Sequence, residues 1–446
     1  MSTLAVPDRE LSWWKEPTKD QWYAYIAAWL GWTLDAFDFT VFLLIMLPIS
    51  QEFGVPLTAV TAVFAVTLWM RLGGATAAGW MADRMGRKAP LMISILWYSV
   101  CNFIAGFSPS FAFLFFWRAM LGIGMGAEWP AGAALAMESW PARSRGFMSG
   151  LLQGSWGLGF ALSSLCYGFL YEPLEAMGKG YGWRGMLMIG VLPALVCVWI
   201  RFYVKEPDVW AENKTLQTAR SAEIKLPLFA IFKPAYLWNT ITACLWMAAN
   251  FCAYYSIWGL FGTYLQKDLG WSPLMVATPL FWANVLVFAS SGIWGAVSDR
   301  FGRRRAIMIP CAIGIFLTPI YLMTKDPMWI IGGFILQAFF AGAKDSQNPS
   351  YLSERFPTEV RATAAGFVYH QGAIWGGFVA PIISYFAVEQ HIGFAVPMLI
   401  GTAGCLAVLI FAVFLGPETK GKVLSSDIEV IKLNNAGVTE AGVAAQ

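Results

Sequence analysis

Long apolar runs separated by short polar segments dominate the hydropathy pattern of this chain. About twelve of these runs are near the ~20 residues that a helix needs to cross a hydrocarbon core of ~30 Å. They lie at 22–49, 58–82, 89–107, 111–137, 145–171, 184–204, 237–264, 275–297, 305–323, 328–353, 361–387 and 393–415. The pattern predicts an all-α integral membrane protein with about twelve transmembrane helices.

A short basic segment occurs twice, each time between two apolar runs. Residues 79–88 read GWMADRMGRK and residues 295–305 read GAVSDRFGRRR. A second pair, ESWPARSRG at 138–146 and ERFPTEVR at 354–361, has the same spacing, because 295 − 79 and 354 − 138 both equal 216. Two pairs in register indicate an internal duplication. We therefore predict two pseudo-symmetric six-helix bundles, at 1–204 and 237–446, joined by a polar linker at 205–236.

The composition supports a membrane protein. Hydrophobic residues make up 58% of the chain and charged residues 13%, whereas soluble domains carry roughly 25% charged residues. The first 21 residues lack the apolar core of a signal peptide, so we expect the first span to direct insertion. All seven cysteines fall within apolar runs without metal-like spacing, so we expect small core residues, no metal and no cofactor.

Basic residues gather in the connections after spans two, four, six, eight and ten. These connections hold Arg84, Arg87, Lys88, Arg143, Arg145, the linker lysines Lys205, Lys214, Lys225 and Lys233, and Arg300, Arg303, Arg304, Arg305, Arg355 and Arg361. The positive-inside rule places such loops in the cytoplasm, and both termini with them. The arginines are therefore explained by topology, and with a net charge of only +3 we expect a lipid bilayer and no nucleic acid as partner.

Two sets of motifs resemble known families. The doubled basic loop, the two-part arrangement of spans and RAMLGIGMG at 118–126 resemble the major facilitator superfamily over essentially the whole chain. GWTLDAFDF at 31–39, MGAE at 125–128 and ESWP at 138–141 resemble the sialate:proton symporter family, which includes sialic acid carriers and yeast-type lactate/pyruvate permeases. LWMR at 68–71 looks more like the permeases. The resemblance implies a monomeric, proton-coupled carrier of a carboxylate in the plasma (inner) membrane.

Charged residues inside the spans are the first functional candidates, because each costs roughly 2.5 to 3.5 kcal/mol unless it is paired or faces water. Asp35 and Asp38 are three residues apart and share one helical face. An unpaired carboxylate at that depth favours its protonated form, although each acid could instead neutralise an arginine. By resemblance, Arg118 next to Asp38 or Asp35 would form the proton-coupling pair, and Glu128 on the same span as Arg118 joins this group.

A second group of polar residues could bind the substrate. Arg71 has no acid at helical spacing, so its partner is a span-one aspartate or a substrate carboxylate. The offset of 216 relates Glu128 to Lys344, which predicts either a gate between the halves or two internal pairs. The further candidates share hydroxyl, amide or cationic groups that could bind a hydroxy acid or simply link helices; they are Arg118, Gln347, Asn348, Asn250, Tyr254, Tyr255, His370 and Gln371.

The doubled loops point to a mechanical role. Asp83 and Asp299 are predicted to cap the helix that follows each loop and to bind Arg145 and Arg361, closing the cytoplasmic side. The full predicted gating set is Asp83, Arg84, Arg87, Arg145, Glu138, Asp299, Arg300, Arg303, Glu354 and Arg361. Spans two and four are rich in glycine, at Gly73, Gly74, Gly79, Gly122, Gly124 and Gly126. A phosphate-binding role for these glycines is excluded, because they lie inside apolar spans without a Gly-Lys-Ser/Thr sequence.

The sequence thus predicts proton-coupled symport of a small organic anion, such as lactate, pyruvate or a sialic or sugar acid, by alternating access. A sugar or multidrug porter of the same fold is an alternative, and a nutrient sensor that no longer transports is an alternative of another class. No nucleophile arrangement, metal cluster or nucleotide loop is evident, so we do not expect an enzyme.

Overall fold

The structure is a computed structural model that describes residues 14–219, 227–271 and 273–424. Helices account for nearly all of the ordered elements, and no residue within these ranges lies in a β-strand. Among the described residues, eight helices are long and apolar enough to cross a membrane. The predicted all-α membrane fold is therefore confirmed.

The helices follow the predicted spans closely. The first half comprises α1 (Lys19–Phe53), α2 (Leu57–Met85), α3 (Lys88–Ala105), α4 (Phe111–Ser139), the short helix η1 (Ala142–Ser144), α5 (Arg145–Ala176), α6 (Tyr181–Ile189) and α7 (Ala194–Tyr203). The connection carries α8 (Asp208–Ala219) and α9 (Pro227–Ala230). The second half comprises α10 (Pro234–Ile257), α11 (Phe261–Lys267), α12 (Pro273–Phe301), α13 (Arg303–Leu322), α14 (Pro327–Phe340), η2 (Ala341–Gln347), α15 (Asn348–Arg355), α16 (Arg361–Ser384), η3 (Tyr385–Glu389) and α17 (Ala395–Leu415).

The internal duplication extends to the helix boundaries. Adding 216 to the bounds of α2 gives the bounds of α12, and adding it to the bounds of α4 gives the start of α14 and the end of α15. The two halves differ within that last span, however. Whereas α4 is continuous, its counterpart passes through the 3-10 segment η2. Irregular backbone at such depth is tolerated where it lines a cavity.

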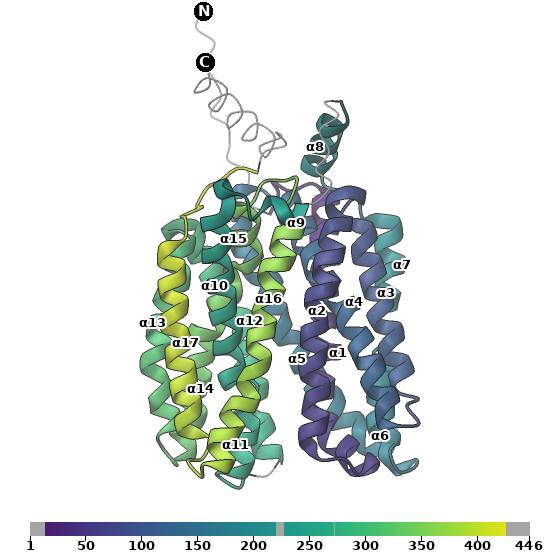
Figure 1. The fold of residues 1–446 in the computed structure, drawn as a ribbon, viewed down its shortest axis with the longest axis vertical. Coiled ribbons are helices and arrows are strands. Elements are labelled where there is room, and N and C mark those ends of the chain that lie inside the picture. Colours follow the sequence, from purple (N-terminus) through teal and green to yellow (C-terminus); the bar gives the residue numbers. More distant parts are fainter. Residues whose placement is uncertain (1–13, 220–226, 272, 425–446) are drawn as a thin grey trace, which may run out of the picture.

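The two halves lie side by side as two bundles (Figure 1). The helices α8 and α9 lie at one end of the bundles, and α6 and α11 lie at the opposite end (Figure 1). The indole of Trp210 on α8 donates a hydrogen bond to the carbonyl of Asp83 at 3.4 Å, which places the duplicated basic loop at the same end. We call this end the basic end.

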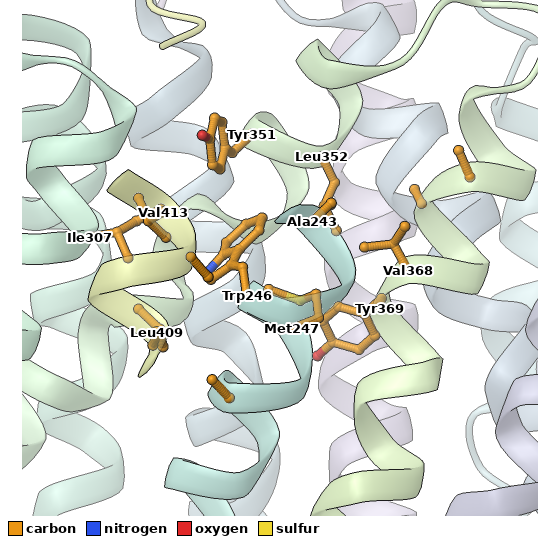
Figure 2. Close-up of a cluster of buried hydrophobic side chains, with 14 of the residues drawn as sticks. Ala243, Trp246, Met247, Ile307, Tyr351, Leu352, Val368, Tyr369, Leu409 and Val413 are labelled. Carbon is orange, nitrogen blue, oxygen red and sulfur yellow. The ribbon is translucent and has the colours of Figure 1, made fainter. Parts of the chain in front are cut away.

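Each bundle has its own apolar core. In the second half, Figure 2 shows Trp246 on α10 among side chains from α13, α15 and α17. The Trp246 ring is fully buried and lies 5.0 Å from that of Tyr351 between centroids. Large apolar side chains also cover the outside, for example Phe202 and Phe316, which are 76% and 77% exposed. Such an exterior suits lipid.

Glycines bring the two halves into backbone contact along α5 and α12. A Cβ atom on Gly150 would lie 2.0 Å from the carbonyl oxygen of Ser291, and one on Gly157 would lie 2.5 Å from that of Asn284. The symmetry-related pair, α2 and α16, is also close, because a Cβ on Gly79 would lie 2.7 Å from Cα of Thr363. Small residues are what allow helices to approach this closely in a membrane.

Aspartates from the basic loops also join the halves. Asp83 accepts hydrogen bonds from the backbone amides of Ala362 and Thr363, at 3.2 and 2.9 Å, at the start of α16. Asp299 accepts from the amides of Gly146 and Phe147, both at 2.9 Å, at the start of α5. The prediction that each aspartate caps the helix following its own loop is therefore wrong. Each one caps a helix of the opposite half.

The helix that follows each basic loop is capped by a different acid. Asp83 and Asp299 are therefore available to cap helices of the opposite half. Glu206, beyond α7, accepts from the amides of Arg87 and Lys88 at 2.6 and 2.9 Å. Burial raises the pKa of Glu206 although these bonds oppose the shift. Glu418, beyond α17, accepts in the same way from the first two amides of α13, at 2.8 and 3.1 Å.

The predicted partners of Arg145 and Arg361 are also corrected. Arg361 contacts Glu138 at 2.7 Å and Arg145 contacts Glu354 at 3.6 Å, so both arginines pair with glutamates of the opposite half. Each glutamate also binds an arginine of its own half through two hydrogen bonds. The arginines that complete these two networks are Arg87, 2.8 Å from Asp83, and Arg303, 2.7 Å from Asp299.

Two further members of the predicted gating set have contacts besides those of the two networks. Arg84 lies over the ring of Trp80, with 4.9 Å between Cζ and the centroid. Arg300 is exposed, and its backbone carbonyl accepts a hydrogen bond from Lys420 at 2.6 Å. Their role in gating stays a prediction.

The close approach of the α5 and α12 backbones at Gly150 yields a first prediction. Gly150→Leu should lower the melting temperature by several degrees, because a side chain there meets the α12 backbone and overpacking typically costs about 1 to 3 kcal/mol. Gly404→Leu is the matched control, since a Cβ on Gly404 meets no atom within 4 Å. Tryptophan fluorescence during a thermal ramp measures both variants. Equal melting temperatures would contradict the backbone contact.

Candidate functional site

A partly open cavity lies between the two halves. Its atom-free space amounts to about 690 Å³ when open solvent at its mouth is included. Helices of the first half contribute Trp32, Arg71, Gln153, Trp156 and Gly157 to its lining, and the second half contributes Asn250, Phe251, Tyr254, Tyr255, Trp258, Asn284, Val287, Ser291, Gly342, Asp345 and Tyr369. A concave site with aromatic walls and a few polar groups is the usual form of a small-molecule site.

Arg71 on α2 carries the positive charge of the first-half wall. Its Nη2 atom lies 3.4 Å from Asp35, a long contact made by one nitrogen only. The guanidinium lies over the ring of Phe39 at 4.6 Å, and Nη2 also approaches the sulfur of Met125 at 3.0 Å. The Nε atom has no hydrogen-bond partner among the described residues. Arg71 thus contacts a span-one aspartate, Asp35, which is one of its two predicted partners. It also faces the cavity, where the other predicted partner, a substrate carboxylate, would bind.

Asp38 and Arg118 form a separate group behind the cavity wall. Both side chains are fully buried, and neither residue lines the cavity. Arg118 donates to Asn102 at 3.1 Å and lies over the ring of Phe42 at 4.2 Å. Within the described ranges, both oxygens of Asp38 lack a hydrogen-bond partner, as do Nε and Nη2 of Arg118. Asp35 and Asp38, although one helical turn apart, therefore face different arginines.

Glu128 and His370 are buried beside the cavity rather than in its lining. Glu128 is 1% exposed, lies against Gly31, and neither of its oxygens has a hydrogen-bond partner in the described part of the chain. His370 is also 1% exposed; its Nδ1 lies 3.1 Å from the carbonyl of Gly366, and its Nε2 is unpartnered within the same ranges.

The second-half wall carries an adjacent ion pair in the 3-10 segment η2. Lys344 contacts Asp345 at 2.7 Å, and the side chain of Asp345 is 20% exposed against 4% for Lys344. The amides of Asn250 and Asn348 both donate to Asp345. Lys344 therefore pairs within its own half, and the arrangement in which it meets Glu128 across the cavity is absent from this conformation.

The other predicted binding residues divide into two groups. Asn250, Tyr254 and Tyr255 line the cavity as expected for binding residues. Gln347 and Gln371 do not line it. Gln347 donates to the carbonyl of Trp294 on α12 at 3.4 Å, and Gln371 donates to the carbonyl of Cys244 on α10 at 2.8 Å. These two glutamines therefore link helices, which is the alternative that the sequence left open.

Sequence reasoning did not assign a role to several residues of the lining. Trp32 and Trp156 lie 4.8 Å apart between ring centroids, and Trp156 donates to the hydroxyl of Tyr254 at 3.1 Å. Gln153 donates to the hydroxyl of Tyr369 at 3.2 Å across the boundary between the halves. These two residues are 216 positions apart, so the duplication offset that relates the motifs could have identified the pair.

No group of histidine, cysteine, aspartate or glutamate residues with the geometry of a metal site occurs in the described ranges. The cysteines in those ranges are free thiols. The site is thus built from one guanidinium, one lysine–aspartate pair, amides and aromatic rings. These groups can bind and orient a small molecule, and the buried acids can hold a proton.

Comparison with characterised sequences identifies relatives that are transporters. The chain is 27% identical to the sialic acid transporter NanX of Escherichia coli, over 92% of this chain and 98% of that protein. It is 29% identical to a probable 4-methylmuconolactone transporter of Cupriavidus pinatubonensis, over 92% and 94% of the two chains. The cis,cis-muconate transport protein of Acinetobacter baylyi is 26% identical, over 88% and 94%.

Solved structures share the fold. The proton:xylose symporter XylE bound to 6-bromo-6-deoxy-D-glucose has a TM-score of 0.75 at 18% identity, over 93% of this chain and 99% of that one. XylE from E. coli in a partially occluded inward-open conformation has a TM-score of 0.68 at 20% identity, over 91% and 100%. The relatives and the fold are those of secondary transporters and not of enzymes. Because the family model of the Major Facilitator Superfamily matches residues 28–290 and 245–436, this chain belongs to that superfamily.

Proposed function

We propose that this transporter carries a small organic anion together with a proton. The observation that carries the proposal is Arg71, whose side chain is 4% exposed and lines the cavity between the halves. Among the described residues, its guanidinium meets an acid only through Nη2, at 3.4 and 3.5 Å from the two oxygens of Asp35. A buried charge without full compensation is costly. A substrate carboxylate would supply the missing hydrogen bonds, because it matches the planar guanidinium with two parallel contacts.

The relatives support an anionic substrate. Proteins similar over most of this chain are named as carriers of sialic acid and of cis,cis-muconate. Both compounds are carboxylates at neutral pH. The likeness to a xylose symporter rests on identities of 18% to 20%, so it concerns the fold and carries no argument for a neutral sugar.

Coupling to a proton follows because Asp35 and the substrate carboxylate would both bind Arg71. When Asp35 is ionised, it competes with a substrate carboxylate for Nη2 of Arg71. When Asp35 is protonated, its attraction for Arg71 is lost and the guanidinium can bind the substrate fully. Proton and anion therefore favour each other's binding, which is the thermodynamic condition for symport. Glu128, buried and unpartnered among the described residues, is a second place for a proton.

The networks at the basic end act as the gate in this mechanism. Asp83 and Asp299 each tie one half to the first amides of a helix in the other half, so the present conformation is closed at that end. By the positive-inside rule, the basic end faces the cytoplasm. Opening toward the cytoplasm then requires both sets of bonds to break as the halves rock about the central site.

Substitution of Arg71 tests the anion site. Arg71→Lys should weaken binding of the preferred carboxylate at least tenfold, roughly 1.4 kcal/mol, because an ammonium cannot form the paired contact. Calorimetry on purified protein measures the affinity, after a thermal-shift panel of lactate, pyruvate, sialate and aromatic acids has identified the ligand. The methyl ester of the same acid is the control and should bind to neither protein. Unchanged affinity in a folded variant would assign Arg71 to structure alone.

The coupling proposal rests on Asp35. Asp35→Asn should abolish accumulation driven by a pH gradient in proteoliposomes while downhill exchange continues, because the proton site is lost and Arg71 stays available. Asp326→Asn is the control for loss of an acid, since Asp326 is exposed and outside the cavity lining. We expect it to retain gradient-driven uptake. Normal accumulation by Asp35→Asn would refute the assignment, and binding without any accumulation by the native protein would indicate a sensor.

The gate yields a kinetic prediction. Asp299→Ala should slow transport severalfold while the equilibrium affinity for substrate changes by less than about twofold, since neither Asp299 nor the two amides it binds line the cavity, and their bonds hold a conformation rather than a ligand. Asp326→Ala is a matched control, because Asp326 also caps a helix, at 2.8 Å from the amide of Met328, but within one half. A defect confined to affinity would count against a gating role.

A further inference from the structure

Aromatic side chains form most of the broad faces of the cavity. Trp32 and Trp156 stand on the first-half wall, with Tyr254, Tyr255 and Trp258 opposite. The rings of Tyr254 and Trp258 are nearly parallel, at 20° and with 6.1 Å between their centroids, and both residues line the cavity. Stacked and edge-to-face aromatic contacts contribute about 0.5 to 1.5 kcal/mol beyond area burial. These walls favour a flat, unsaturated ligand.

The unpartnered polar atoms of the first-half lining are hydrogen-bond donors only. Among buried polar side-chain atoms of the lining, Nε1 of Trp32 and Nε of Arg71 have no partner within the described residues. Indole and guanidinium nitrogens can only donate hydrogen bonds. The first-half wall therefore presents donors and a positive charge, which together suit a carboxylate.

The second-half wall presents acceptors. The carbonyl oxygen of Asn250 and the hydroxyl of Ser291 are buried and without partners in the described part of the chain. Asp345 lines the cavity beside them. Its carboxylate already accepts from Lys344, Asn250 and Asn348, and a carboxylate has about four lone-pair sites. One further donor, such as a ligand hydroxyl, can therefore be accepted.

Few polar groups remain for a heavily hydroxylated ligand. The amide nitrogen of Asn284 is used by the carbonyl of Leu280 at 2.8 Å, and both ends of Gln153 are used by Trp129 and Tyr369. Every ligand hydroxyl that is buried without a partner loses its hydration, at a cost of about 1 to 3 kcal/mol. A sugar acid would bury several such hydroxyls here.

We propose, building on the anion-carrier function above, that the substrate is a planar aromatic monocarboxylate with a hydrogen-bond donor at its far end. Its carboxylate binds Arg71 and Trp32, its ring lies between the aromatic walls, and its donor binds Asp345. Asp345 also selects against a second carboxylate, because two like charges would meet in an apolar cavity. Lys344 cannot neutralise that second charge while it is buried behind Asp345 and paired with it.

A ligand series on the native protein tests this class directly. We expect 4-hydroxybenzoate to bind at least tenfold more tightly than 4-methoxybenzoate, which has the same shape but no donor, and at least tenfold more tightly than terephthalate, which has a second carboxylate. N-acetylneuraminate should bind more weakly than benzoate. Isothermal calorimetry on the purified full chain gives all five affinities without any substitution.

Substitution of Asp345 provides the second arm. In Asp345→Asn, terephthalate should gain at least tenfold in affinity, since the repelling charge is gone and Lys344 is free to pair. The same change should weaken 4-hydroxybenzoate by about fivefold and leave benzoate within twofold, because benzoate has no far-end donor. A thermal ramp verifies folding, and if the variant does not fold the native series decides alone.

The outcomes separate the two proposals. Tightest binding of terephthalate or N-acetylneuraminate by the native protein, or equal binding of the hydroxy and methoxy compounds, would overturn the substrate class while leaving an anion carrier. Binding of neutral sugars or esters in preference to every acid would overturn the proposed function itself. The predicted order in the native protein, together with its inversion in Asp345→Asn, would support both.

Discussion

The cost of placing charge in an apolar interior governs this molecule. A membrane-spanning bundle has little water with which to solvate ions, so each buried charge must find a partner or serve a purpose. At the basic end that requirement is met completely for Glu138, which binds Arg87 of its own half and Arg361 of the other. Around the central cavity it is met only in part, because Arg71 has one long contact and the oxygens of Glu128 have none among the described residues. Full compensation holds a closed structure together, whereas partial compensation leaves energy available for a ligand and a proton.

Pseudo-symmetry makes the closed end a cooperative device. The same bonds occur twice, but each aspartate reaches the opposite half, so Asp83 and Asp299 cross the boundary in opposite directions. The helices they cap, α16 and α5, are also those whose backbones meet α2 and α12. Separating the halves therefore breaks capping bonds, salt bridges and glycine contacts together. Such coupling favours two distinct conformations over a continuum of intermediate ones.

Much of this architecture could be predicted from the sequence, because hydropathy and repeat spacing are local properties. The spans, the offset of 216 and the buried charges all follow from residue identity along the chain. The partners of those charges could not be predicted in the same way. Helical periodicity places Asp35 and Asp38 on one face but does not say that the neighbouring helices offer Arg71 to one and Arg118 to the other. Likewise, the crossing of Asp83 to α16 depends on Glu206 having already capped α3, a contact between residues more than a hundred positions apart.

The duplication is preserved at the basic end and lost at the cavity. The two networks at the basic end match almost residue for residue, as the proposed rocking of the halves would require on both sides. The walls of the cavity do not match: α4 runs unbroken, whereas its counterpart unwinds at η2 and brings the Lys344–Asp345 pair to the cavity. One wall thereby offers donors and positive charge, and the other offers acceptors. Such a site would hold an asymmetric ligand in one orientation. In the proposed mechanism, the two pseudo-symmetric halves rock about that site and so expose the ligand to either side of the membrane.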